Sequence, residues 1–190
     1  MFLDRWPLPC LQGSSRSYMA VQHDPSGGCI GGEGNVKVWG VENLRQGDFV
    51  YSKKVKHLRQ GDFVETPSGW EKIECVMVSN ATDMVLLSDR LLITPWHPVR
   101  VIGNTEWTFP SQWPEKTTSE REAAYSILLV NRGVSLIVNE TFECICLAHG
   151  IIDDPVARHG YYGTEAVVES MRMMQGWNVG IVDARAPLSI

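Results

Sequence analysis

Apolar and polar residues alternate over short stretches through most of the chain after residue 35. The alternation is clear at residues 36–38, 48–51, 62–65 and 72–78, and turn-forming residues separate these stretches. A period of two is typical of strands that have one buried face. Many short strands with frequent turns predict an all-β domain. Further strand candidates are residues 84–87, 91–94, 99–102, 125–130, 134–138 and 142–147.

The two ends of the chain depart from this pattern. Residues 1–28 show no period and are rich in Pro, Ser and Gly, which is typical of a linker or an extended arm. In residues 165–174, apolar and small side chains recur at the spacing of one helix face. Thr164 can cap the first turn and Gly176 can end the helix, so we expect one short helix there.

The composition is that of an ordinary globular protein, with 44% hydrophobic and 21% charged residues. The formal charge is −5 and no Lys/Arg run is longer than Lys53-Lys54, so we expect no nucleic-acid partner. The apolar runs are too short to span a membrane. Charges and prolines interrupt the first residues, which favours the cytoplasm over secretion. The five cysteines lack the spacing of a disulfide scaffold and favour a reducing compartment.

Two glycines precede Cys29. A cysteine thiolate can attack the carbonyl of the residue before it and form a thioester, provided that this carbonyl is uncrowded and the peptide is deformable. Gly27 and Gly28 meet both conditions because they carry no Cβ. The alternative is a flexible turn followed by a small buried cysteine.

Thr94 and His97 lie at the end of a predicted strand, in a segment with two prolines. At this spacing a hydroxyl and an imidazole can share one side of a tight turn. The imidazole can donate a proton to a departing amide nitrogen, and the hydroxyl can polarise or distort the peptide. Pro95 and Pro98 stiffen the turn. The alternative is an ordinary turn histidine that is capped by the backbone.

Cys144, Cys146 and His149 form a third group. In a strand, residues 144 and 146 face the same side. Three ligands at this spacing do not match a structural zinc site, so we predict no bound metal and no cofactor. Core cysteines and a place in a processing site both stay open as interpretations.

Together these segments resemble the Hint domains of inteins and hedgehog proteins. Residues 29–36 resemble the opening of hedgehog-type members, with a Gly-Cys junction, a Gly three residues after the Cys and a Val seven residues after it. Residues 55–64 look like the family's V-x-x-L-x-x-G-D-x-V strand, and Thr94 and His97 match its T-x-x-H block. Order and rough spacing agree over about residues 27–150.

The Vint subgroup, Hint domains found beside von Willebrand A domains, is more similar still. This resemblance implies a Hint-like horseshoe of short strands over residues 29–150, an N-terminal arm over residues 1–28, and a C-terminal extension with one helix over residues 151–190. The segments that carry the resemblance are the Gly-Gly-Cys junction, residues 93–98, 107–110 and 148–150, and the tail around residues 161–164 and 176–177.

The resemblance implies autocatalytic processing by an N-to-S acyl shift at the Gly28–Cys29 bond. Cys29 would be the nucleophile, His97 would assist departure of the amide, and Thr94 would orient or polarise it. The polypeptide upstream in the same chain, such as a von Willebrand A domain, would then pass to water, a thiol or an amine. The result would be cleavage or ligation, in a single turnover.

The second step has weaker candidates, namely His149 with Cys144 or Cys146. Protein-splicing inteins end in His-Asn, and the Asn side chain cyclises to cut the second junction. Here Gly150 follows His149 and the chain continues to Ile190, so we expect no full splicing. One alternative function is a degenerate Hint domain that serves as a protein-interaction module, and another is a zinc-binding β module.

The sequence of residues 44–50 recurs unchanged as residues 58–64. Two copies are too few for a solenoid, so we interpret them as a local duplication in which one copy is the native strand and the other an inserted hairpin arm. We expect residues 58–64 to pack in the core sheet, because the Pro67-Ser68-Gly69 turn and a further strand follow them as in the Hint family.

Overall fold

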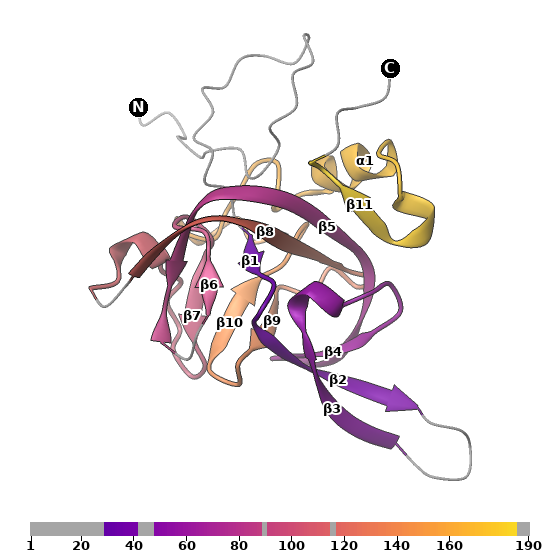
Figure 1. The fold of residues 1–190 in the computed structure, drawn as a ribbon, viewed down its shortest axis with the longest axis horizontal. Coiled ribbons are helices and arrows are strands. Elements are labelled where there is room, and N and C mark those ends of the chain that lie inside the picture. Colours follow the sequence, from indigo (N-terminus) through magenta and orange to yellow (C-terminus); the bar gives the residue numbers. More distant parts are fainter. Residues whose placement is uncertain (1–28, 42–47, 89–90, 115–116, 186–190) are drawn as a thin grey trace, which may run out of the picture.

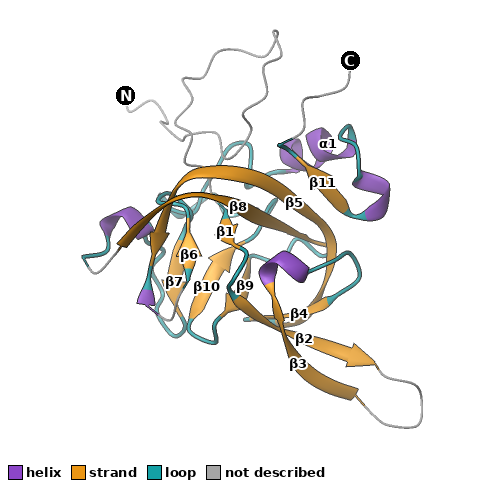
Figure 2. Ribbon diagram, viewed as in Figure 1, coloured by secondary structure: helices purple, strands orange, loops and turns teal. Residues whose placement is uncertain are grey.

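Strands make up most of the described chain, which comprises residues 29–41, 48–88, 91–114 and 117–185 of this computed structural model. Figures 1 and 2 show the arrangement. The strands are β1 (Ile30–Gly31), β2 (Asn35–Val41), β3 (Asp48–Lys54), β4 (Phe63–Thr66), β5 (Gly69–Leu86), β6 (Leu92–Ile93), β7 (Val99–Val101), β8 (Thr117–Leu129), β9 (Ser135–Val138), β10 (Phe142–Ile145) and β11 (Ile181–Asp183). The helices are α1 (Glu165–Arg172) and the short 3-10 helices η1 (Val55–His57), η3 (Pro110–Gln112) and η4 (Trp177–Val179). The prediction of a mostly β fold with one C-terminal α-helix is confirmed for this part of the chain, whereas the expected arm, residues 1–28, lies outside it.

A long antiparallel ribbon of β5 and β8 frames the domain. The two strands pair from Ile73 opposite Leu129 to Leu86 opposite Thr117. A straight strand of 18 residues would extend about 60 Å, and the ribbon instead arches over the other strands (Figure 1). This curvature lets one end of β5 pair with β4 and the other end pair with β6.

The expected break within β5 is wrong. The sequence predicts two separate strands, residues 72–78 and 84–87. The residues between them, which include Asn80 and Asp83, have a weak preference for a turn. In the structure these residues stay extended, since they pair across to β8, with Ser79 opposite Ala124 and Asp83 opposite Glu120. Pairing over many residues outweighs the weak local turn preference.

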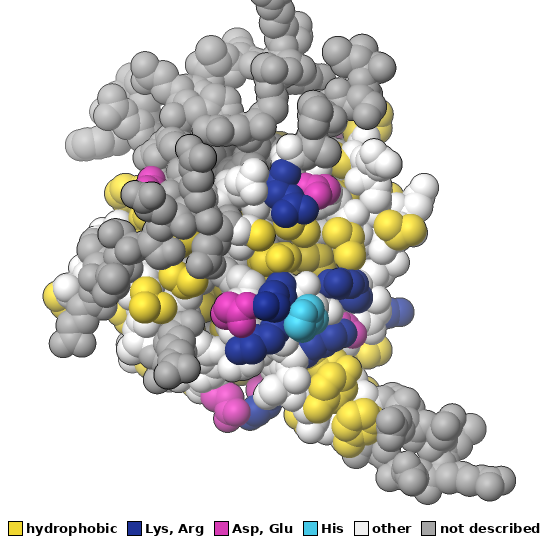
Figure 3. All heavy atoms as spheres, viewed as in Figure 1, with side chains coloured by type: hydrophobic (Ala, Val, Ile, Leu, Met, Phe, Trp, Pro, Cys, Tyr) yellow, Lys and Arg dark blue, Asp and Glu magenta, His cyan; other side chains and the backbone are white. Residues whose placement is uncertain are grey.

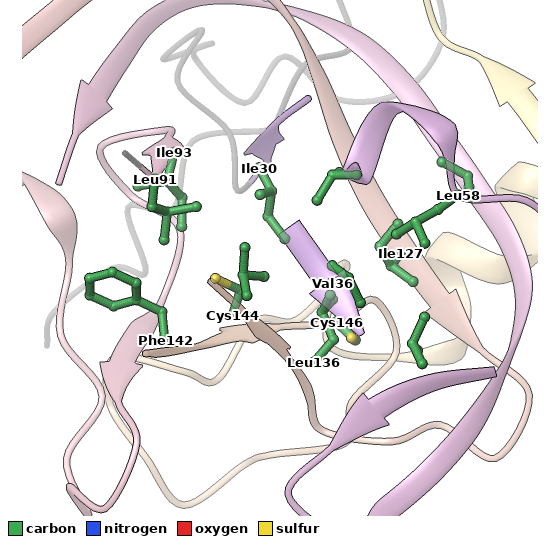
Figure 4. Packing of buried hydrophobic residues seen from close by; sticks show 14 of the residues in the cluster. Ile30, Val36, Leu58, Leu91, Ile93, Ile127, Leu136, Phe142, Cys144 and Cys146 are labelled. Atoms are coloured by element: carbon green, nitrogen blue, oxygen red, sulfur yellow. The ribbon is translucent and has the colours of Figure 1, made fainter. Parts of the chain in front are cut away.

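The main hydrophobic core lies under the arch. A three-stranded sheet of order β7-β10-β9 closes it. β1, which lies between β6 and β8 in the larger sheet, contributes Ile30. Figure 4 shows Ile30, Phe142, Cys144 and Leu136 converging in this core. The core therefore joins the start of the domain to its late strands, which is the condition for bringing Cys29 beside distant residues.

The two copies of the repeated sequence lie in different environments, as predicted. Val64 in β4 is fully buried, whereas the equivalent Val50 in β3 is 53% exposed. Among the described strands, β3 pairs with β2 alone, at the edge of the sheet, and the β2–β3 hairpin protrudes from the domain (Figure 1). Phe63 contacts the Trp39 ring, whereas Phe49 stacks on Tyr51 and is 39% exposed. The described part of the first copy, residues 48–50, therefore belongs to the hairpin arm.

The C-terminal residues form a second, smaller core against the ribbon. The Thr164 hydroxyl accepts a hydrogen bond from the Ala166 amide, which caps α1 as expected, and the helix ends at Arg172, two residues earlier than predicted. Val167, Val168 and Met171 are buried in this core. It also contains Cys75, Met77 and Leu128 from the ribbon. β11, which the sequence pattern does not predict, pairs in parallel with β5.

Positive charge gathers on the face over β3 and η1, where Figure 3 shows several Lys and Arg side chains close together. Much of it is offset locally, because Lys54 and Lys56 both pair with Glu33 and Lys53 pairs with Asp62. Within the described residues, no helix is long and apolar enough to cross a membrane.

Candidate functional site

Strand register places Cys29 between two other strands. In the antiparallel pair of β1 and β6, Ile30 lies opposite Ile93, and in the pair of β1 and β8 it lies opposite Tyr125. One step back along β1, the same register sets Cys29 beside Thr94 on one side and beside Ser126 on the other. Residues 65 and 97 positions away in sequence therefore meet at Cys29.

Thr94 contacts both backbone groups of Cys29. The Cys29 amide donates to Thr94 Oγ1 at 2.8 Å, and the Thr94 amide donates to the Cys29 carbonyl at 2.9 Å. Both residues are fully buried. The amide nitrogen of Cys29, which would leave in an acyl shift, is thus held in a fixed orientation by Thr94, the residue that the motif predicts to orient or polarise it.

A close approach of β1 to β6 makes this geometry possible. A Cβ on Gly31 would lie 2.6 Å from Leu92 Cβ and 3.0 Å from the Leu92 carbonyl oxygen, closer than atoms can pack. Glycine at this position therefore lets the two short strands pair directly after Cys29.

Two serines that the sequence analysis missed contact the Cys29 sulfur. Ser126 Oγ donates to Cys29 Sγ at 3.3 Å, and Ser79 Oγ lies 3.4 Å from the same sulfur. Both serines are buried and come from the facing strands of the ribbon. A single serine in a strand carries no spacing signal, and only the pairing of β1 with β8 and β5 with β8 would have revealed them.

The Cys29 sulfur is disulfide-bonded in the structure. Cys75, Cys144 and Cys146 are free. The reducing compartment that the cysteine pattern favours stays a prediction, because the bonding of individual cysteines does not identify a compartment. A disulfide sulfur cannot attack a carbonyl, so chemistry at Cys29 requires reduction first.

His97 follows Thr94 across a tight turn. The His97 amide donates to the Thr94 carbonyl at 3.1 Å, and His97 is only 2% exposed. The turn thus brings the histidine into the same buried region as Thr94, as the motif predicts. That its ring reaches the Cys29 amide nitrogen stays a prediction.

Cys144 and Cys146 point into the main hydrophobic core (Figure 4). Burial raises the pKa of both thiols well above the ordinary value. They are therefore neutral at physiological pH and poor nucleophiles. Of the two interpretations that the sequence left open, this environment favours core cysteines, although the strand lies beside the His97 turn through the bond from the Ile145 amide to the Pro98 carbonyl.

His149 lies with the C-terminal extension. Its Nδ1 accepts a hydrogen bond from the Ile151 amide at 3.0 Å, and its ring packs against Gly163, where an added Cβ would lie 2.9 Å from Nε2. Burial lowers the pKa of His149 to about 4, so the ring is neutral at pH 7. These contacts hold the extension to the domain, and they involve neither Thr94 nor the two serines that contact Cys29.

The described part of the chain contains no group of three or more His, Cys, Asp or Glu side chains that could bind a metal ion. The Cys144 and Cys146 thiols face the main core, whereas the His149 ring faces the extension. The zinc-binding alternative therefore lacks support in these residues.

Comparison with known proteins gives one decisive match. No curated protein matches the chain. Among solved structures, similar chains include the VidaL intein, at 12% identity and a TM-score of 0.47 over 62% of this chain and 97% of that one. Another is the gp41-1 intein, at 14% identity and a TM-score of 0.45 over 62% of this chain and 98% of that one. The family model of Vint, a Hint-domain, matches residues 9–187. Because this match spans nearly the whole chain, the protein belongs to the Vint family of Hint domains.

Proposed function

We propose that this Hint domain cleaves the Gly28–Cys29 peptide bond of its own chain through an N-to-S acyl shift. The observation that carries the proposal is the pair of hydrogen bonds between Cys29 and Thr94. Membership of a self-processing family supports the reaction class.

The step begins with reduced Cys29, whose thiol loses its proton to solvent. The thiolate sulfur attacks the carbonyl carbon of Gly28, a carbon–sulfur bond forms, and the carbon–nitrogen bond breaks. His97 donates a proton to the departing nitrogen, which becomes the free amino group of Cys29. The product is a thioester between Gly28 and the Cys29 sulfur.

Thr94 assists by orienting the departing nitrogen. Its hydroxyl holds the Cys29 N–H on one side at 2.8 Å. As the nitrogen loses its planar geometry, its lone pair therefore develops on the opposite side, where a proton can be delivered. The thioester then passes the upstream polypeptide to water, a thiol or an amine. Gly150 directly follows His149 and has no side chain that could cyclise to complete splicing.

A fusion of a folded protein to the N-terminus of the full chain tests the proposal. The reductant TCEP opens the Cys29 disulfide without attacking a thioester, and hydroxylamine then attacks a thioester in preference to a peptide. We expect release only when both reagents are present, with a hydroxamate on the upstream product and Cys29 as the first residue of the other product, as measured by intact mass spectrometry.

Cys29→Ala should abolish release, whereas the matched control Cys75→Ala, which removes another buried thiol, should release as the wild type does. Release from the Cys29→Ala fusion at the wild-type rate would identify a contaminating protease and overturn the proposal. A folded wild-type fusion that releases nothing would also overturn it and leave the interaction module as the function.

A further inference from the structure

We propose that Ser126 and Ser79 stabilise the thiolate of reduced Cys29 by donating their hydroxyl hydrogens to its sulfur. This inference rests on the proposed function, because it concerns the nucleophile of the acyl shift. It assigns a role to two residues that belong to neither the Gly-Cys junction nor the Thr-His turn.

The geometry is that of a sulfur held between two strands. Ser126 Oγ donates to Cys29 Sγ at 3.3 Å from β8, and Ser79 Oγ lies 3.4 Å from it on β5. The Cys29 backbone is fixed by Thr94, so reduction of the disulfide leaves the sulfur within reach of the same hydroxyls. Ser79 is fully buried and Ser126 is 3% exposed, so little water competes for these bonds.

Apolar side chains also surround Cys29. Cys29 packs with Ala81, Met84 and Ala124. Hydrocarbon surroundings alone penalise a thiolate, as they do at Cys144, where burial raises the pKa of the thiol. Hydrogen bonds to the charged form act in the opposite direction. The two hydroxyls therefore supply hydrogen bonds that stabilise the thiolate of Cys29, whereas Cys144 lies in a hydrophobic cluster.

The two serines contribute unequally. Ser79 Oγ lies 3.4 Å from the Cys29 sulfur and also 3.4 Å from the Ala124 carbonyl oxygen, and its one hydrogen can serve only one of them at a time. With a protonated thiol, Ser79 can donate to Ala124 and accept from the S–H. Once the thiol is ionised, the same hydrogen can turn to the sulfur. Ser126, whose hydroxyl already donates to the sulfur, should have the larger effect.

Thiolate stabilisation leaves a kinetic signature. If a serine lowers the pH of half-ionisation by about one unit, it raises the thiolate fraction about tenfold below that pH, but reduces the reactivity of each thiolate about threefold. Removal of the serine should therefore slow release about threefold at neutral pH and accelerate it about threefold where the thiol is fully ionised. Loss of a merely structural contact would slow release at every pH.

The first readout is an ultraviolet titration of the thiolate in the isolated full chain, reduced with TCEP. Subtraction of the Cys29→Ala titration removes the tyrosines and the other cysteines. We expect half-ionisation about one pH unit higher in Ser126→Ala, a smaller increase in Ser79→Ala, and the wild-type value in the matched control Ser135→Ala, a buried serine whose hydroxyl donates to Glu143 instead. Ser126→Thr keeps the hydroxyl and should restore the wild-type value.

The same half-ionisation pH in the wild type and the folded Ser79→Ala/Ser126→Ala variant would overturn the inference. If Ser126→Ala fails to fold, Ser79→Ala and Ser126→Thr still decide it by the same titration. The titration requires no cleavage, so it can confirm the role of the two hydroxyls even in a chain that releases nothing. If the chain releases the upstream protein but the serine variants titrate as the wild type does, the role of the hydroxyls is refuted and the proposed function is not. The second readout, for an active chain, is the crossover of the release rates with pH.

Discussion

Cys29 and Thr94 share two hydrogen bonds, one from each backbone amide, although 65 positions separate them in sequence. One bond is backbone to backbone and extends the pairing of β1 with β6, and the other uses the Thr94 hydroxyl. The threonine therefore holds both the position of Cys29, the proposed nucleophile, and the orientation of its amide nitrogen, the proposed leaving group. This dual contact explains why a threonine at the end of a short strand belongs to the motif.

Thr94→Val tests the hydroxyl. Valine has nearly the same shape but leaves the buried Cys29 amide without the Thr94 oxygen as acceptor, which costs about 1–3 kcal/mol. We expect hydroxylamine-dependent release to slow by roughly 10–100-fold, the rate equivalent of such a loss. Thr94→Ser, which keeps the oxygen, should stay near the wild-type rate. A valine variant that releases as fast as the serine variant would exclude this role.

His97→Ala tests proton donation to the departing nitrogen. A positioned acid–base group contributes roughly 10²–10⁴ in rate, so release should slow by that factor. The matched control is His57→Ala, which removes an exposed histidine of η1. Single-turnover release, followed by gel densitometry, measures both. Equal rates for the two variants would show that the buried histidine is structural.

Cys146→Ala separates a core role from a role in the second step. The side chain is 2% exposed in the main core, so its truncation should lower the free energy of unfolding by about 1–2 kcal/mol. Thiol-induced release at Gly28–Cys29 should stay largely intact. Urea unfolding and release, measured on the same preparation, check both. A folded variant that no longer releases would place Cys146 in the first step.

The sequence predicts the elements of this domain better than their lengths. The alternating stretches correspond to strands, and Thr164 caps the helix as expected. β5 runs through a polar stretch that favours a turn, because pairing with β8 decides its conformation. β11 has three residues and no local signal, and it forms because the extension docks on the ribbon.

The sequence likewise predicts some residues of the candidate site and not others. Cys29 and Thr94 are recognisable because a glycine, a proline or a fixed spacing accompanies each of them. Ser79 and Ser126 have no such companions, and they reach the sulfur only through the register of two strand pairs. Register depends on the whole hydrophobic pattern of a sheet, and a shift of one residue would turn either hydroxyl to the other face.

Two histidines, His149, which is buried, and His159, which is half-buried, should make the stability of the domain depend on pH. Burial lowers the pKa of His149 and of His159 to about 4, and for His159 the nearby His149 adds to the effect. In the unfolded chain a histidine titrates near pH 6.5. Between these values the unfolded state binds more protons than the folded state. The free energy of unfolding therefore has its full value above about pH 6.5 and decreases as the pH falls towards 4.

The test replaces both histidines with asparagine, whose side-chain oxygen can accept a hydrogen bond in place of Nδ1. Nδ1 of His149 accepts from Ile151, and Nδ1 of His159 accepts from the Tyr161 and Tyr162 amides. Between pH 7 and pH 5, we expect the free energy of unfolding of the double variant to fall by about 1–3 kcal/mol less than that of the wild type, as measured by urea titration. An unchanged decrease would assign the acid sensitivity to other groups.

The duplicated sequence offers its own control for burial. Val50 and Val64 occupy the same place in identical seven-residue copies, but Val50 is 53% exposed on the protruding hairpin and Val64 is fully buried in β4. Val64→Ala removes two buried methyl groups and should lower the free energy of unfolding by about 1–3 kcal/mol. Val50→Ala should change it by less than about 0.5 kcal/mol, as surface substitutions do. Urea unfolding of the two variants measures the difference directly. Because the local sequence is the same, any difference comes from tertiary position. Equal losses would mean that the two copies exchange places in the sheet, and the assignment of residues 58–64 as the native strand would be wrong.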